Sequence, residues 1–158
     1  MKLNFLIIFL FTFHFFTFSQ SKKEVKANKI KASGTTTTEN GKTFAESKII
    51  FDNKGNEIEK TDYNKEGNIK SIHKTKYNSD GDEIEDEEYD SANKFVEKKI
   101  TKYNMLGVKT EESYFDINGK LTKKHVYLYD GKGLKIERKT LDADGKIISV
   151  KKHVYITK

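Results

Sequence analysis

Nine hydrophobic residues recur along this chain at steps that alternate between 12 and 14 residues. The two steps add up to a 26-residue internal repeat, and a fixed period of that size indicates one supersecondary unit used several times over. We refer to these residues as the anchors of the repeat: Phe51, Tyr63, Tyr77, Tyr89, Tyr103, Phe115, Tyr129, Leu141 and Tyr155. This period constrains the architecture more than any other feature of the sequence.

A turn signal follows each of the first eight anchors. Asp or Asn stands directly after the anchor, and Gly stands four residues after it in seven cases. The eighth turn has Asn93 in place of Gly. A type I turn favours Asp or Asn at its first position, and a left-handed residue at its end is most easily Gly and next most easily Asn. The pattern therefore predicts eight equivalent hairpin turns.

The segments between these turns alternate apolar and polar residues and are rich in β-branched and aromatic side chains, which predicts strands. Because every connection is a hairpin, neighbours in sequence are expected to pair as antiparallel neighbours in space. We therefore predict an all-β fold, an antiparallel meander of about nine strands that forms a twisted single sheet or a loosely closed barrel. The expected strands span residues 43–51, 57–63, 69–77, 83–89, 95–103, 109–115, 121–129, 135–141 and 147–156.

The anchors and the charged residues predict a register. All nine anchors have odd numbers, which places them on one face of the sheet, because side chains alternate along a strand. Three-residue loops with a glycine bulge would then set acidic residues opposite basic or imidazole side chains. The predicted pairs are Glu59 with His73, Glu85 with Lys99, Glu111 with His125 and Glu137 with Lys151. The same register sets Glu87 opposite Glu97, a like-charge pair that costs stability.

The chain divides into three parts. Residues 1–19 contain Lys2, a long apolar block, and small residues near position 19, a pattern typical of a cleaved secretory signal. An uncleaved membrane anchor is the alternative, although a core of about 16 residues is short for a bilayer span. We predict a flexible N-terminal lead over residues 20–42 and one β-hairpin repeat domain over residues 43–158. The chain is not expected to span a membrane after cleavage.

Composition fits an exported protein better than a nucleic-acid-binding one. Without the signal, 29 basic and 24 acidic residues leave a net charge of +5. This charge is moderate and spread along the chain, so it does not indicate a nucleic-acid partner. The sequence has no Cys, so strand pairing and packing must hold the exported chain together without disulfides. We expect the protein in the periplasm, on the outer surface or in the medium.

The turn motif resembles a known repeat. An aromatic residue, Asp, two variable residues and Gly, as in residues 51–55 and 129–133, is similar to the YD repeats of Rhs-type bacterial surface and toxin proteins. The resemblance covers most of residues 51–158 and implies hairpin-rich β-sheet at the cell surface or in the periplasm, with a glycan as the implied ligand. The chain departs from that family in its longer period, in the absence of a toxin domain, and in being too short to enclose a cargo.

The residue types that build catalytic and metal sites are scarce, so we expect neither enzyme activity nor a cofactor. His73 and His125 stand at the same repeat position, and four strands would separate them by roughly 19 Å, too far to share a metal. His153 falls in a different column of the sheet. The acidic turns at Asn78 and Asp142 lack the distal Glu of an EF-hand loop, which argues against calcium.

An aromatic row is the first candidate binding surface. If these rings face outward, they are suited to stack on sugars or to receive cations. The plain alternative is that they only cover the sheet where aliphatic side chains are few. The row consists of Tyr77, Tyr103, Tyr129 and Tyr155.

The last segment, from residue 147 onward, is the second candidate. As an edge strand it would offer unpaired backbone groups to a protein partner that adds a strand, although its lysines also suit protection against such pairing. The apolar residues expected on one face of this edge are Ile148, Val150, Val154 and Ile156.

These features lead to one predicted function and one alternative. We predict an exported, non-catalytic repeat protein that acts as a binding or structural module of the bacterial cell envelope. The alternative is a carbohydrate-binding protein that uses the aromatic row. The expected partner is an envelope protein or a glycan, with an anionic lipid or polysaccharide surface as a third option because the even-numbered face is rich in lysine.

Overall fold

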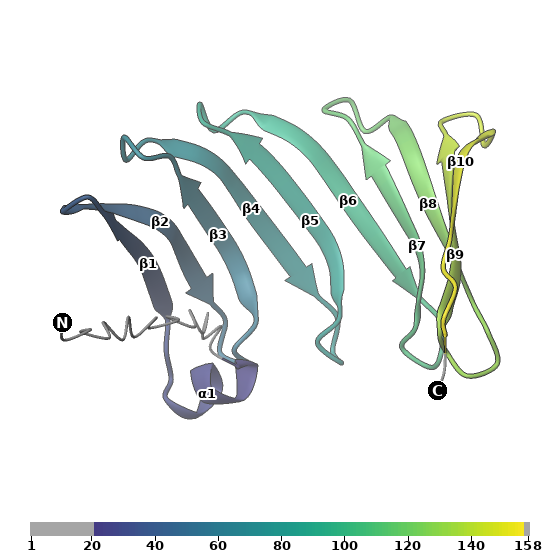
Figure 1. Ribbon diagram of the computed structural model, residues 1–158, viewed down its shortest axis with the longest axis horizontal. Coiled ribbons are helices and arrows are strands. Elements are labelled where there is room, and N and C mark those ends of the chain that lie inside the picture. The colour runs from purple at the N-terminus through teal and green to yellow at the C-terminus, as the bar shows by residue number, and fades with distance from the viewer. Residues whose placement is uncertain (1–20, 157–158) are drawn as a thin grey trace, which may run out of the picture.

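The computed structural model describes residues 21–156, which form one helix and a ten-stranded antiparallel sheet (Figure 1). The strands lie side by side in sequence order, and among the described residues β1 pairs only with β2 and β10 only with β9. The predicted antiparallel meander and twisted single sheet are therefore confirmed, and the sheet does not close into a barrel. The strands are β1 (Ala32–Glu39), β2 (Lys42–Phe51), β3 (Glu57–Tyr63), β4 (Ile69–Tyr77), β5 (Glu83–Asp90), β6 (Phe95–Tyr103), β7 (Lys109–Phe115), β8 (Leu121–Tyr129), β9 (Lys135–Asp142) and β10 (Ile147–Lys152).

The segment expected to be a flexible lead is ordered instead. Helix α1 (Lys22–Ala27) begins with a capping box, in which Ser21 and Glu24 each bind the other's backbone N–H. Strand β1 then pairs with β2 through a tight turn at Asn40 and Gly41, both with positive φ. The lead prediction overlooked that a run of threonines favours a strand, so the meander has ten strands rather than nine. The predicted signal segment, residues 1–19, lies outside the described residues.

The eight predicted turns are confirmed, and each is built in the same way. At the first, Asp52 Oδ1 accepts hydrogen bonds from the backbone N–H groups of Lys54 (2.7 Å) and Asn56 (2.9 Å). Its carbonyl accepts one from the N–H of Gly55 (3.1 Å). The seven turn glycines have φ between 72° and 88°, and Asn93 has φ 57°. The side-chain oxygen of Asp or Asn thus satisfies the two N–H groups that the reversal of the chain leaves free.

The predicted register is wrong by one residue because every one of these hairpins contains a second β-bulge, just beyond the glycine bulge of its loop. Tyr63 pairs with Ile69 as expected, but Asp62 pairs with Ser71, so Lys70 has no partner across the ladder. Beyond the bulge Glu59 faces Lys74 rather than His73. A bulge increases the local twist, and the side chains beyond it point to the face opposite the predicted one. The bulged residues, always the second of their strand, are Ile58, Lys70, Ile84, Val96, Thr110, Thr122, Ile136 and Ile148.

The same shift moves the other predicted pairs. Glu85 faces Ile100, Glu111 faces Val126, and Glu137 faces Lys152. The expected like-charge pair of Glu87 with Glu97 is also displaced. Glu87 faces Lys98, and the residue opposite Glu97 is Glu88.

The bulges also divide the anchors between the two faces of the sheet. Ile72 of β4 pairs with Tyr89, whereas Tyr77 lies five residues further along β4 and therefore points to the other side. We call the side that carries His73 and His125 the histidine face. Its anchors are Phe51, Tyr77, Tyr103 and Tyr129, and the opposite face carries Tyr63, Tyr89, Phe115 and Leu141. The prediction that all anchors share one face is wrong for this reason.

Within residues 21–156, neither face of the sheet is covered by a second layer. Among the described residues Val25 of α1, which is 1% exposed, is the one buried hydrophobic side chain, and α1 lies below the ends of β1 to β3 (Figure 1). The buried polar residues are Asn56, Thr61, Thr101, Glu112, Ser113 and Thr140. Strand pairing and cross-strand polar contacts must therefore contribute most of the stability of this sheet.

A glycine pair tests how α1 docks. A Cβ added to Gly55 (φ +81°) would stand 2.6 Å from the carbonyl oxygen of Lys22, whereas one added to Gly67 (φ +82°) meets nothing within 4 Å. Gly67→Ala is expected to cost about 1 to 2 kcal/mol from the left-handed backbone alone. Gly55→Ala is expected to cost more and to raise hydrogen exchange in residues 22–27. Equal effects of the two substitutions on unfolding and exchange would contradict docking of α1 on this turn.

A threonine pair tests the cost of a buried unpaired hydroxyl. Thr101 is 4% exposed, and its hydroxyl has no hydrogen-bond partner among residues 21–156. Thr75, one repeat earlier, donates to Asp86 at 3.3 Å. We expect Thr101→Val to raise the free energy of unfolding by about 1 kcal/mol and Thr75→Val to lower it by a similar amount. Urea denaturation measures both, and destabilisation by Thr101→Val would show that its hydroxyl is satisfied.

Candidate functional site

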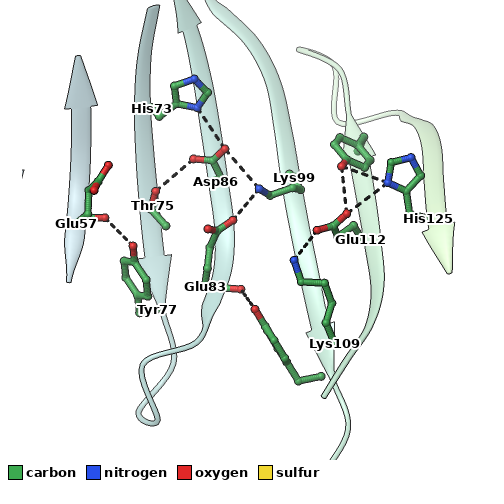
Figure 2. A network of polar contacts seen from close by, with 12 residues as sticks. Glu57, His73, Thr75, Tyr77, Glu83, Asp86, Lys99, Lys109, Glu112 and His125 are labelled. Atoms are coloured by element: carbon green, nitrogen blue, oxygen red, sulfur yellow. Dashed lines mark hydrogen bonds and ion pairs between the residues drawn. The ribbon is translucent and has the colours of Figure 1, made fainter. Parts of the chain in front are cut away.

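The histidine face carries a polar network that crosses the middle of the sheet from β4 to β8 (Figure 2). Its centre is a row of titratable residues spaced 13 apart in sequence, because each 26-residue repeat places one of them on a long strand and one on a short strand. The row consists of His73, Asp86, Lys99, Glu112 and His125. The two histidines were predicted to occupy equivalent positions, but their carboxylate partners were not predicted. The 13-residue spacing is the signal that identifies these partners.

Glu112 of β7 is the most enclosed member of the row, with a side chain 9% exposed. Lys109 binds its Oε1 at 2.7 Å. Oε2 lies 3.3 Å from His125 Nδ1 and 3.3 Å from the hydroxyl of Tyr114, and it also accepts a hydrogen bond from the hydroxyl of Tyr127. The donors come from β7 and β8, so this carboxylate ties two neighbouring strands together.

These donors control the ionisation of the carboxyl group. Burial alone would raise its pKa, but the bonds from Lys109 and Tyr127 outweigh burial and lower the pKa of Glu112 to about 2. Burial, together with the charge of Glu112, raises the pKa of Tyr114 to about 12. Glu112 is therefore ionised and fully engaged at neutral pH, which suits a structural anion and not a proton donor or acceptor.

A second cluster lies around Asp86 of β5. Its carboxylate accepts from Thr75 at 3.3 Å, lies 3.3 Å from His73 Nδ1, and lies 3.8 Å from Lys99 Nζ. Lys99 also forms an ion pair with Glu83 at 2.7 Å. Burial opposes the charge of Lys99, but the bond to Glu83 prevails and raises the pKa of its ammonium group. The cluster connects β4, β5 and β6 in the way that Glu112 connects β7 and β8.

The rings of the aromatic row are fixed to the neighbouring strand. The hydroxyls of Tyr77, Tyr103 and Tyr155 each donate to a backbone carbonyl 20 residues earlier, those of Glu57, Glu83 and Lys135, at 2.8 Å. Tyr129 occupies the equivalent position on β8, and the described hydrogen bonds include none from its hydroxyl. Burial raises the pKa of Tyr77 to about 12. These bonds place the rings along the sheet, and stacking of a ligand on them stays a prediction.

The C-terminal edge is the other candidate. All six residues of β10 are exposed, and of the described strands only β9 pairs with it. Ile148 is the bulged residue, Val150 lies within β10, and Val154 and Ile156 follow its last residue, Lys152. The four are 59%, 46%, 88% and 97% exposed in that order. The structure thus places all four predicted residues at the free edge, although only two of them lie within the strand.

Within residues 21–156, no group of three or more His, Cys, Asp or Glu side chains is arranged to hold a metal ion. The one described helix is not long and apolar enough to cross a membrane.

Comparison with known proteins gives remote likenesses. No family model matches the chain, and no curated protein matches it. A crystal structure of a protein of unknown function from Bacteroides fragilis is similar over 80% of this chain and 96% of its own, with 17% identity and a TM-score of 0.43. A porin-like protein from Bacteroides uniformis is similar over 69% of each chain, with 12% identity and a TM-score of 0.35. These likenesses are too distant to assign a family or a function.

Proposed function

We propose that this chain is an exported, non-catalytic repeat protein that serves as a binding or structural module of the bacterial cell envelope, and that it binds by strand addition at β10. The signal-like pattern of residues 1–19 supports export. The satisfied, ionised Glu112 supports a structural rather than a catalytic role for the network. The observation that carries the proposal is the free outer edge of β10.

Among the strands of residues 21–156, only β9 pairs with β10, so the backbone of β10 is unpaired on its other side. His153 donates its N–H to the carbonyl of Ile136 on β9 at 2.9 Å, so Lys151 and His153 direct their backbone groups inward. Because direction alternates along a strand, Val150 and Lys152 direct theirs outward. This edge is exposed and partly apolar, although Lys151 and Lys152 are of the type that natural sheets use to protect an edge. An extended segment of another protein would satisfy these groups by β-augmentation.

The test compares proline substitutions at the two edges of the sheet. Val150→Pro removes one outward N–H without removing a bond to β9. Ala32→Pro removes one outward N–H of β1 without removing a bond to β2. The reason is that the neighbouring Lys31 directs its carbonyl inward to the N–H of Phe51, so Ala32 directs its own groups outward. Each full-length variant is used to capture proteins from an envelope extract. We expect Val150→Pro to lose the captured partner and Ala32→Pro to retain it. Retention by both variants would refute strand addition at β10.

A carbohydrate-binding function is the second candidate, because Tyr77, Tyr103 and Tyr129 lie on the same face, two strands apart from one another. Aromatic faces spaced in this way suit a row of sugar rings. Glycan titration of the parent and of Tyr103→Ala and Tyr129→Ala variants tests it. Loss of binding in both variants supports the aromatic row, and unchanged binding, or none by the parent, rejects it.

A further inference from the structure

The strands alternate in charge across the sheet. The long strands β4, β6 and β8 are basic: β4 contains Lys70, Lys74 and Lys76 and no acidic residue, and β8 contains Lys123 and Lys124 and no acidic residue. The short strands between them are acidic, most clearly β5, which has six acidic residues and no basic one. Strands β4 and β6 therefore lie between acidic strands, and β8 has one acidic neighbour, β7. Cross-strand pairs of opposite charge favour this arrangement.

The alternation breaks at the C-terminal edge. Strand β10 is basic, with Lys151 and Lys152 and no acidic residue. Its neighbour β9 has three basic residues and two acidic ones, a net of +1, unlike the other short strands. Lys151 lies opposite Arg138, a like-charge pair, which is destabilising. Strand β10 thus lacks the acidic neighbour that the basic strands β4, β6 and β8 each have on at least one side.

The repeat gives the register of the missing partner. Residues of β10 correspond to residues 78 positions earlier in β4, which is three repeats of 26. On β4 His73 pairs with Glu88, Lys74 with Glu87, and Thr75 with Asp86. A segment that takes the place of β5 beside β10 would therefore set acidic side chains opposite Lys151, Lys152 and His153.

We propose that β10 takes an acidic extended segment of another protein, added antiparallel as an eleventh strand. This inference rests on the proposed function and specifies the partner of the same edge. The sheet's own second edge is a poor match, since β1 (Ala32–Glu39) has one acidic residue and is mostly threonine and small residues. Charge complementarity therefore favours an acidic partner over a second copy of this chain.

The test uses this chain's own β5 sequence as the probe. A labelled peptide of residues 81–90 (GDEIEDEEYD) is titrated with the full chain by fluorescence anisotropy, beside a neutral peptide with every Asp changed to Asn and every Glu to Gln. We expect the acidic peptide to bind about tenfold more tightly than the neutral one. Its affinity should fall as salt rises, because part of the attraction acts between exposed charges.

Three variants locate the binding. The paired substitutions Lys151→Glu and Lys152→Glu should weaken the acidic peptide about tenfold or more, Val150→Pro should abolish binding, and Ala32→Pro should leave it unchanged. Binding that survives Val150→Pro would mean attraction to a charged surface without strand addition, and it would overturn the inference.

Other outcomes separate this inference from the proposed function. Equal binding of the neutral and acidic peptides, lost in Val150→Pro, would keep strand addition and reject the acidic partner. No peptide binding, with envelope capture unaffected by Val150→Pro, would reject both. Sedimentation that shows oligomers lost in both Val150→Pro and Ala32→Pro would assign the edge to a second copy and reject the acidic partner.

Discussion

Replacing Glu112 by alanine is expected to lower the free energy of unfolding by about 2 to 4 kcal/mol. The substitution leaves Lys109 and His125 without their carboxylate and leaves the hydroxyl of Tyr127 without its acceptor. The side chains of Glu112 and His125 are 9% and 14% exposed, so water cannot readily replace their bond. Lys109 is 37% exposed and regains part of its hydration. Urea denaturation of the full chain measures the effect.

Glu97→Ala is the matched control. Glu97 lies on the same face in the adjacent long strand, but its side chain is 30% exposed and has one ion pair, to Lys123 at 3.3 Å. Exposed pairs of this kind contribute about 1 kcal/mol or less. If the two substitutions destabilise the protein equally, the Glu112 network contributes no more than an ordinary surface pair.

Acid is expected to destabilise the sheet through the same carboxylate. The pKa of Glu112 is lowered from its ordinary value of 4.5 to about 2 in the folded state. A group whose folded pKa is depressed stabilises the fold above the unfolded pKa, and that stabilisation is lost as pH falls toward the folded pKa. Between about pH 4.5 and pH 2 the loss is expected to reach about 2 kcal/mol, after allowance for solvent screening.

A Glu112→Gln variant isolates this contribution, because glutamine keeps the shape and cannot titrate. The stability of the parent should exceed that of the variant at neutral pH, and the difference should shrink by about 2 kcal/mol between pH 4.5 and pH 2. Other carboxylates with a lowered pKa, such as Asp52 and Glu111, titrate alike in both proteins. A difference that stays constant over this range would contradict the ionised network.

The turns were predictable because their chemistry is local. Asp or Asn with Gly three residues later determines where the chain reverses, as Asp52 and Gly55 show. Such reversals at steps that alternate between 12 and 14 residues indicate a meander. The bulges were not predictable in this way, because the bulged position accepts Ile, Val, Thr or Lys and carries no residue of special conformation. One extra residue per hairpin then moved every predicted charge pair by one.

The structure of the N-terminal segment and the polar network around Glu112 were not predicted from the sequence, for different reasons. The flexible lead was inferred from the composition of the segment. The capping box of Ser21 with Glu24 and the run of strand-forming threonines depend on the order of the residues, which composition does not record. The Glu112 cluster depends on contacts between strands, and its partners Tyr114 and Tyr127 become neighbours only in the correct register. The edge at β10 was predicted because any strand of a meander that is not followed by another strand leaves the backbone groups on one side unpaired.

Amide hydrogen exchange at β10, followed by NMR with and without the acidic peptide of residues 81–90, tests the central claim most directly. Without peptide, Lys151 and His153 should be protected by β9, while Val150 and Lys152 exchange freely. With peptide, Val150 and Lys152 should become protected as well. Protection of these two amides without any peptide, or their continued free exchange while the peptide is bound, would contradict a free edge that takes an added strand.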